Sequence, residues 1–113
     1  MVDKKELNIV QDEYEVVRLL SQGIEVDRFE YGDSMTPIAL NGQYCHLIPC
    51  EAKDVEQGDA VFCEIGNGIF LTHMVWVKNK ATNQCLIGST SGHLNGWTDK
   101  IYAKAIPIDL FED

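Results

Sequence analysis

The chain has 113 residues, 45% of them hydrophobic and 24% charged, which suits one globular domain with a modest core. Lys and Arg number 9 against 18 Asp and Glu, and this net charge of −9 argues against a nucleic-acid-binding module, whose phosphate contacts need clustered cations. No apolar run approaches the roughly 20 residues that cross a bilayer, and the polar start lacks the pattern of a secretory signal, so we expect a cytoplasmic protein without a membrane partner.

The N-terminal part of the chain predicts a polar tail followed by one short amphipathic helix. From Asp12 to Gln22, apolar residues recur at steps of three and four, the spacing of one helix face. Gly23 stands where a left-handed residue closes many helices. The residues expected on the buried face are Val10, Tyr14, Val17 and Leu20. We therefore divide a single domain of residues 1–113 into a tail and helix at 1–23 and a β core at 24–108.

Beyond Gly23, short apolar stretches between turn residues predict β-strands. The expected strands are residues 24–31, 43–49, 59–65, 69–77, 84–87 and 100–108. Gly66-Asn67-Gly68 is a hairpin signal, and the segment 88–98, rich in Gly, Ser, Thr and Asn, is expected to be a loop. This pattern indicates a mainly β fold, with rolled antiparallel sheets and one short N-terminal helix.

Two polar residues stand out against this pattern. His73 interrupts the most apolar strand, between Leu71 and Met74, where a polar ring needs a hydrogen-bond partner or a function. Ser34 lies 39 residues earlier in Gly-Asp-Ser-Met-Thr-Pro, residues 32–37. A nucleophilic serine needs an exposed hydroxyl on a rigid turn with backbone N–H groups nearby. A neutral imidazole within reach can take its proton and later return it to the leaving amine.

Together these features resemble the superfamily of serine peptidases that includes signal peptidases and the self-cleaving SOS and phage repressors. The order of the Gly-x-Ser-Met-x-Pro box at 32–37, the strand after Gly58-Asp59 and the base some forty residues after the serine is similar over about residues 24–106. Most members use Lys as the base. Thr72-His73-Met74-Val75 resembles the branch of endoplasmic-reticulum and archaeal signal peptidases, which uses His. The segment 92–97 is similar to a tail in prophage-encoded members.

The resemblance implies a fold of coiled antiparallel strands and the activity of a soluble serine endopeptidase that cleaves or self-cleaves a peptide bond. Ser34 would attack the scissile carbonyl, and His73 would act as base and then as acid. The backbone N–H of Ser34 and the stretch at Gly32 would form the oxyanion hole. No cofactor or metal is implied. The partner would be a protein or peptide substrate, extended along a strand edge.

The chain departs from the His branch where a Gly-Asp-Asn type turn supplies the carboxylate that orients the base. Here the turn is Ile87-Gly88-Ser89-Thr90, so Ser89 and Thr90 become the candidate orienting residues. Losing that carboxylate in a Ser-His-Asp enzyme can cost about 10⁴ in rate. The alternative function is therefore a catalytically weak or inactive peptidase-like domain that serves protein interaction or dimerisation. Repressor-type members dimerise through this domain, so a homodimer is an expected form.

Lysines and cysteines offer two weaker alternatives. Lys78 and Lys80 could serve as the base, but each lies at an odd separation from His73 and would face the other side of a regular strand. Cytoplasmic cysteines are expected to be buried thiols rather than disulfides. They also lack the spacing of a zinc knuckle, so no metal is predicted. The cysteines are Cys45, Cys50, Cys63 and Cys85, with His46 beside the first.

Overall fold

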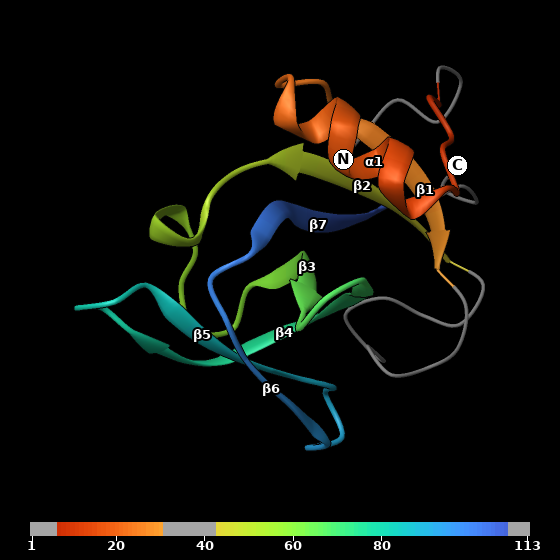
Figure 1. Cartoon of the computed structure of the whole chain (residues 1–113). Helices are drawn as coiled ribbons and strands as arrows, with labels where there is room; N and C mark the ends of the chain where they lie inside the picture. Colours follow the sequence, from red (N-terminus) through yellow and green to blue (C-terminus); the bar gives the residue numbers. More distant parts are fainter. Residues whose placement is uncertain (1–6, 31–42, 109–113) are drawn as a thin grey trace.

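Seven antiparallel strands of the described residues form one curled sheet, a half-barrel, in the order β1-β2-β7-β3-β4-β5-β6 (Figure 1). The computed structural model describes residues 7–30 and 43–108. The elements are α1 (Glu13–Ser21), β1 (Val26–Glu30), β2 (Gln43–Pro49), the 3-10 turn η1 (Ala52–Asp54), β3 (Ala60–Ile65), β4 (Ile69–Asn79), β5 (Gln84–Gly88), β6 (Leu94–Thr98) and β7 (Ile101–Ile108). The predicted mainly β fold with one short helix is confirmed.

Helix α1 begins and ends where the sequence predicts. Asp12 is its N-cap, and the carboxylate accepts hydrogen bonds from the first-turn N–H groups of Tyr14 and Glu15. Its nine residues are too few and too polar for a membrane span, and no other helix among the described residues is long and apolar enough. The predicted buried face is partly wrong. Tyr14 is 71% exposed, whereas Val16, which was not predicted, is completely buried together with Leu20.

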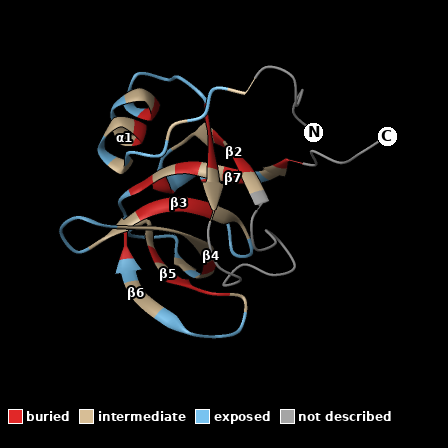
Figure 2. Cartoon of the chain, turned by 90° about the vertical axis from the view of Figure 1, so that its right-hand side faces the viewer, coloured by how far each residue is buried: buried red, intermediate tan, exposed pale blue. Residues whose placement is uncertain are grey.

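The sheet curls around two apolar clusters, and α1 covers the first (Figure 2). Val16 and Leu20 of α1 pack there against strands β1, β2, β3 and β7. The second cluster lies on the opposite face of β3 and β4 and is closed by the segment around η1. Its buried members are Ala52, Val55, Val61, Cys63, Val75, Cys85, Ile87 and Ile101. Strand β4 therefore carries alternate side chains into different clusters, with Phe70 and Met74 in the first and Leu71 and Val75 in the second.

Strand β6 lies in the segment expected to be a loop, so that prediction is wrong for residues 94–98. Asn95-Gly96 has the composition of a turn, but its neighbours pair with β5: Trp97 lies opposite Leu86, and Thr98 opposite Cys85. Ile87 pairs with Gly96 and Gly88 pairs with Leu94, so Asn95 is the extra residue of a β-bulge. Gly96 has φ +143°, a conformation that side chains rarely adopt.

A charged cluster ties the N-terminal segment to the sheet. His46 of β2 places Nδ1 2.7 Å from the Asp27 carboxylate and Nε2 2.5 Å from that of Glu25. The other oxygen of Asp27 accepts the backbone N–H of Asn8, and residues 8–10 pair with Asp27 through their backbone. Burial lowers the pKa of His46, but the hydrogen bonds to Asp27 and Glu25 outweigh burial and raise it above the usual value. The imidazole of His46 thus joins β2 to β1 and, through Asp27, to the N-terminal segment.

This cluster predicts a loss of stability as the pH rises. The raised pKa of His46 means that its contribution is fully present below the unfolded value of about 6.5 and disappears as the pH rises through the folded value. We expect the free energy of unfolding of the native chain to fall, relative to that of His46→Gln, when urea titrations are repeated from about pH 6 to about pH 9. Parallel pH profiles for the two proteins would contradict this origin of the effect.

The β5–β6 junction leaves no room for a side chain at Gly88. A Cβ there would lie 2.7 Å from the backbone oxygen of His93 and 2.9 Å from side-chain atoms of both Leu94 and Trp76. Gly88→Ala should therefore push β6 away and cost about 1–3 kcal/mol in the free energy of unfolding. Trp76 and Trp97 report on this region through their fluorescence. An unchanged unfolding midpoint with unchanged emission would show that the junction accommodates a methyl group.

Candidate functional site

His73 lies at the middle of β4, and its ring is held by a hydrogen bond to Asn95 of β6. The side chain is half-buried, and Val61 is its partner on β3. Nδ1 of His73 lies 2.7 Å from Oδ1 of Asn95. An amide oxygen can only accept, so Nδ1 carries the proton and donates it, which leaves the basic lone pair of the neutral ring on Nε2. This is the protonation state that a general base needs.

Asn95 is a site residue that the sequence analysis missed. It is the bulged residue of β6, and the bulge releases it from the pairing with Gly88 that the register of the preceding pairs would impose. The signal was present, because Asn95 is the first Asn or Asp after the turn at residues 87–90, and asparagine has the shape of the aspartate that the resemblance leads one to seek there. The Asn-Gly pair instead indicated a turn.

Ser89 serves the turn between β5 and β6. It is buried, its hydroxyl lies 2.9 Å from that of Ser91, and its oxygen accepts the backbone N–H of His93 at 3.2 Å. Its carbonyl accepts the indole N–H of Trp76 at 2.9 Å. Ser89 is thus engaged in holding the strand connection, while Asn95 contacts the predicted base. The orienting role expected for Thr90 stays a prediction.

Ser34 and Gly32, the predicted nucleophile and oxyanion-hole residues, lie outside the described residues. The structure does describe the two ends of their segment. Glu30 and Gln43 are paired at the end of the β1–β2 hairpin. The carboxylate of Glu30 accepts the hydroxyl of Thr72 at 2.7 Å, and Thr72 immediately precedes His73. Glu30, the last described residue before that segment, therefore contacts the strand that carries the predicted base, on the face opposite to the His73 side chain.

Glu30 is held by more than this contact. Nε of Arg28 lies 3.1 Å from the same carboxylate, and the guanidinium of Arg28 lies 5.2 Å from the centre of the Phe62 ring. Burial raises the pKa of Glu30 and outweighs the opposite effects of Thr72 and Arg28. The contacts fix the end of β1 against the face of the sheet that carries Thr72.

One side of β4 has no strand partner among the described residues from Ile69 to Thr72. On that side β5 pairs with β4 only from Met74 onward, while β3 occupies the other side throughout. Ile69, at the start of this stretch, is 58% exposed. Unpaired backbone groups at a sheet edge can accept an extended peptide as an added strand. This edge ends at the predicted base.

The lysines lie at the far end of β4. A bulge at Trp76 shifts the register, so Lys78 pairs with buried Cys85 and returns to the face of His73. The expectation that Lys78 faces the other side is therefore wrong, because it assumed a regular strand. Nζ of Lys78 instead lies 3.1 Å and 2.7 Å from the carbonyl oxygens of Lys53 and Val55. Five residues of strand, about 16 Å, separate Lys78 from His73.

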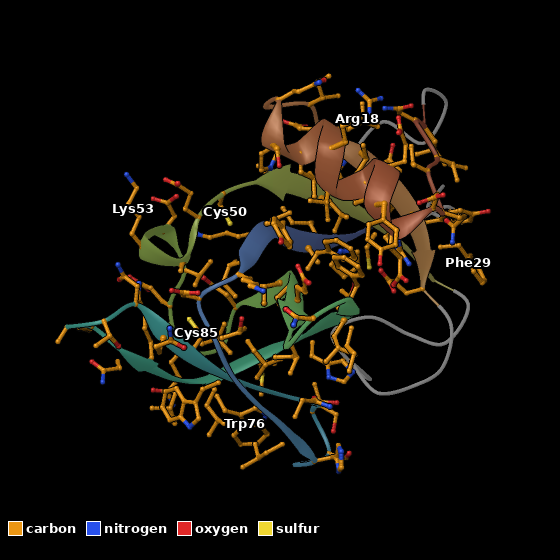
Figure 3. All side chains as sticks on the ribbon, in the orientation of Figure 1. Arg18, Phe29, Cys50, Lys53, Trp76 and Cys85 are labelled. Atoms are coloured by element: carbon orange, nitrogen blue, oxygen red, sulfur yellow. The ribbon has the colours of Figure 1, made fainter. Side chains whose placement is uncertain are left out.

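The four cysteines are free thiols, and the expectation of burial is confirmed for Cys45, Cys63 and Cys85. Burial raises the pKa of both Cys45 and Cys63 to about 12. Cys50 is half-buried near η1, and Cys85 lies within the sheet (Figure 3). Within residues 7–30 and 43–108, no group of three or more His, Cys, Asp or Glu side chains is arranged to hold a metal ion.

The geometry thus contains a histidine whose Nδ1 contacts Asn95, a neighbouring strand edge without a strand partner in the part of the chain that the structure describes, and a contact between Thr72 and Glu30. Comparison with known protein families, curated proteins and solved structures finds no match to this chain.

Proposed function

We propose that this chain is a serine endopeptidase of the signal-peptidase and self-cleaving-repressor superfamily, with Ser34 as nucleophile and His73 as base. The observation that carries the proposal is the hydrogen bond between Thr72 and Glu30. Ser34 follows Glu30 by four residues, which span at most about 14 Å when fully extended. The side chains of Thr72 and His73 point to opposite faces of β4, so the proposal requires these four residues to bring Ser34 round the edge of β4 to the ring.

In the proposed reaction, Nε2 of His73 takes the proton of Ser34 as Oγ attacks the scissile carbonyl carbon. The backbone N–H of Ser34 and the stretch at Gly32 stabilise the oxyanion of the tetrahedral intermediate. The imidazolium then gives its proton to the leaving amine, and an acyl-enzyme forms. Water, deprotonated by the same ring, releases the acid and regenerates the serine.

The substrate in this proposal is an extended protein or peptide segment. Its backbone would pair with the open edge of β4 from Ile69 to Thr72, which brings a peptide bond toward the base at the end of that edge. Four free thiols support a reducing compartment, and we include a cytoplasmic location in the proposal.

A second candidate function is a peptidase-like domain that binds proteins or dimerises without efficient catalysis. Two observations favour it. The partner of His73 is an amide, where a carboxylate would stabilise the imidazolium. Strand β6, at one end of the sheet, also exposes half of Leu94 and half of Trp97. Sedimentation of the chain over a range of concentrations measures dimerisation directly.

Labelling by a fluorophosphonate tests the peptidase. We expect the reagent to modify the native chain at Ser34, and we expect Ser34→Ala to abolish modification. His73→Ala should lower the rate by about 10²–10⁴, because the hydroxyl loses its base. Ser21→Ala, an exposed serine at the end of α1, is the matched control and should label normally. Mass spectrometry locates the adduct, and thermal unfolding shows that each variant is folded.

Peptide-library cleavage by the same proteins completes the test. Cleavage that survives both Ser34→Ala and His73→Ala would refute the proposed dyad. A folded native chain that neither reacts nor cleaves would favour the interaction module.

A further inference from the structure

We propose that Asn95 is the positioning residue for His73, an amide that holds the imidazole in one orientation. The inference rests on the proposed function for its catalytic meaning. Its structural content, that Asn95 fixes the proton on Nδ1, stands on the 2.7 Å contact between Nδ1 of His73 and Oδ1 of Asn95. Asn95 touches the base rather than the reacting atoms.

The contact depends on an irregular strand. Gly88 of β5 pairs with Met74, the residue after His73, and also pairs with Leu94, the residue before Asn95. If the register of Ile87 with Gly96 continued, Asn95 would pair with Gly88. The bulge inserts Asn95 between the paired residues and re-aims its side chain, which is a common use of bulges next to active sites. The bulge in β6 thus brings the amide of Asn95 to the ring of His73.

Two glycines keep this geometry available. Gly96, which follows Asn95, has φ +143°, where most side chains would strain the backbone. Gly88 lies under the junction, and a Cβ there would lie 2.7 Å from the carbonyl oxygen of His93. The positions on both sides of the bulge therefore require glycine, one for its conformation and the other for space.

An amide and a carboxylate at this position have different consequences. Both accept the proton of Nδ1 and fix the same tautomer, but only a carboxylate adds charge that favours the imidazolium. The residues that flank His73 on its own face of β4 are Leu71 and Val75, and its partner on β3 is Val61, all apolar. Asparagine therefore orients the ring without adding a negative charge beside it.

Nuclear magnetic resonance of histidine ring nitrogens tests the tautomer without reference to activity. In ¹⁵N-labelled native chain, with His73 assigned by its loss in His73→Gln, we expect the neutral ring to carry its proton on Nδ1. Asn95→Leu, similar in size but without an acceptor, should lose this preference. Asn95→Asp should keep the tautomer and raise the pKa of His73 by about one unit or more. Asn67→Asp, which adds the same charge at an exposed turn, is the control and should leave it nearly unchanged.

Kinetics on the same variants test the catalytic meaning. Asn95→Leu should lower kcat by about tenfold to a hundredfold with little change in KM, since an unfixed ring deprotonates Ser34 less often. Asn95→Asp should keep kcat close to that of the native chain, and the rising limb of its pH–rate profile should move to higher pH. A native His73 protonated on Nε2, or a pKa that Asn95→Asp leaves unmoved, overturns the assignment of Asn95 whatever the activity. If the ring spectra of His73 are as expected but fluorophosphonate does not label the chain, the proposed peptidase activity is refuted and the positioning of His73 by Asn95 is not.

Discussion

The hydrogen bond from Nδ1 of His73 to Oδ1 of Asn95 is the interaction on which the site depends. A histidine in an apolar strand would otherwise bear a polar ring with two interchangeable protonation sites. Its fixation at 2.7 Å gives the ring one orientation and leaves its basic lone pair on Nε2. The bond joins β4 to β6, which are separated in the sheet by β5, and it requires the bulge at Asn95. The orientation of the His73 ring therefore depends on the bulge in β6.

The curl of the sheet brings the end of the β1–β2 hairpin next to β4. Because β7 lies between β2 and β3, the hairpin that begins the β core becomes part of the same surface as the β3–β6 meander (Figure 1). Glu30 at the end of that hairpin then meets Thr72 of β4. At the opposite end of the hairpin, His46 holds Asp27 and the N-terminal segment through charged hydrogen bonds. One hairpin thus carries His46, which has a structural role, and Glu30, which contacts the strand of the proposed catalytic His73.

Local pattern predicts the helix and six strands because capping residues, alternation and turn glycines act over a few neighbouring residues. It fails where distant contacts decide the backbone. Strand β6 forms around Asn95-Gly96, a turn-like pair that the pairing of Trp97 and Thr98 with β5 overrides. The bulge at Trp76 reverses the face expected for Lys78. His73 drew attention through its unusual place in an apolar strand, and its role as base stays a prediction. Asn95 was missed because a β-bulge, which no local sequence pattern signals, places it beside the ring.

The proposed peptidase requires Ser34 and His73 to lie within reach of one another, and the ionisation of a thiol at residue 34 measures this directly. In Ser34→Cys, an adjacent imidazole should stabilise the thiolate and lower the pKa of the new thiol well below its ordinary value of about 8.5. The native thiols provide a quiet background, since burial raises the pKa of every one of them. Alkylation rates at the introduced thiol, followed by peptide mass spectrometry across pH, should therefore show an early rise that His73→Ala removes. The same pH dependence with and without His73 would contradict the account.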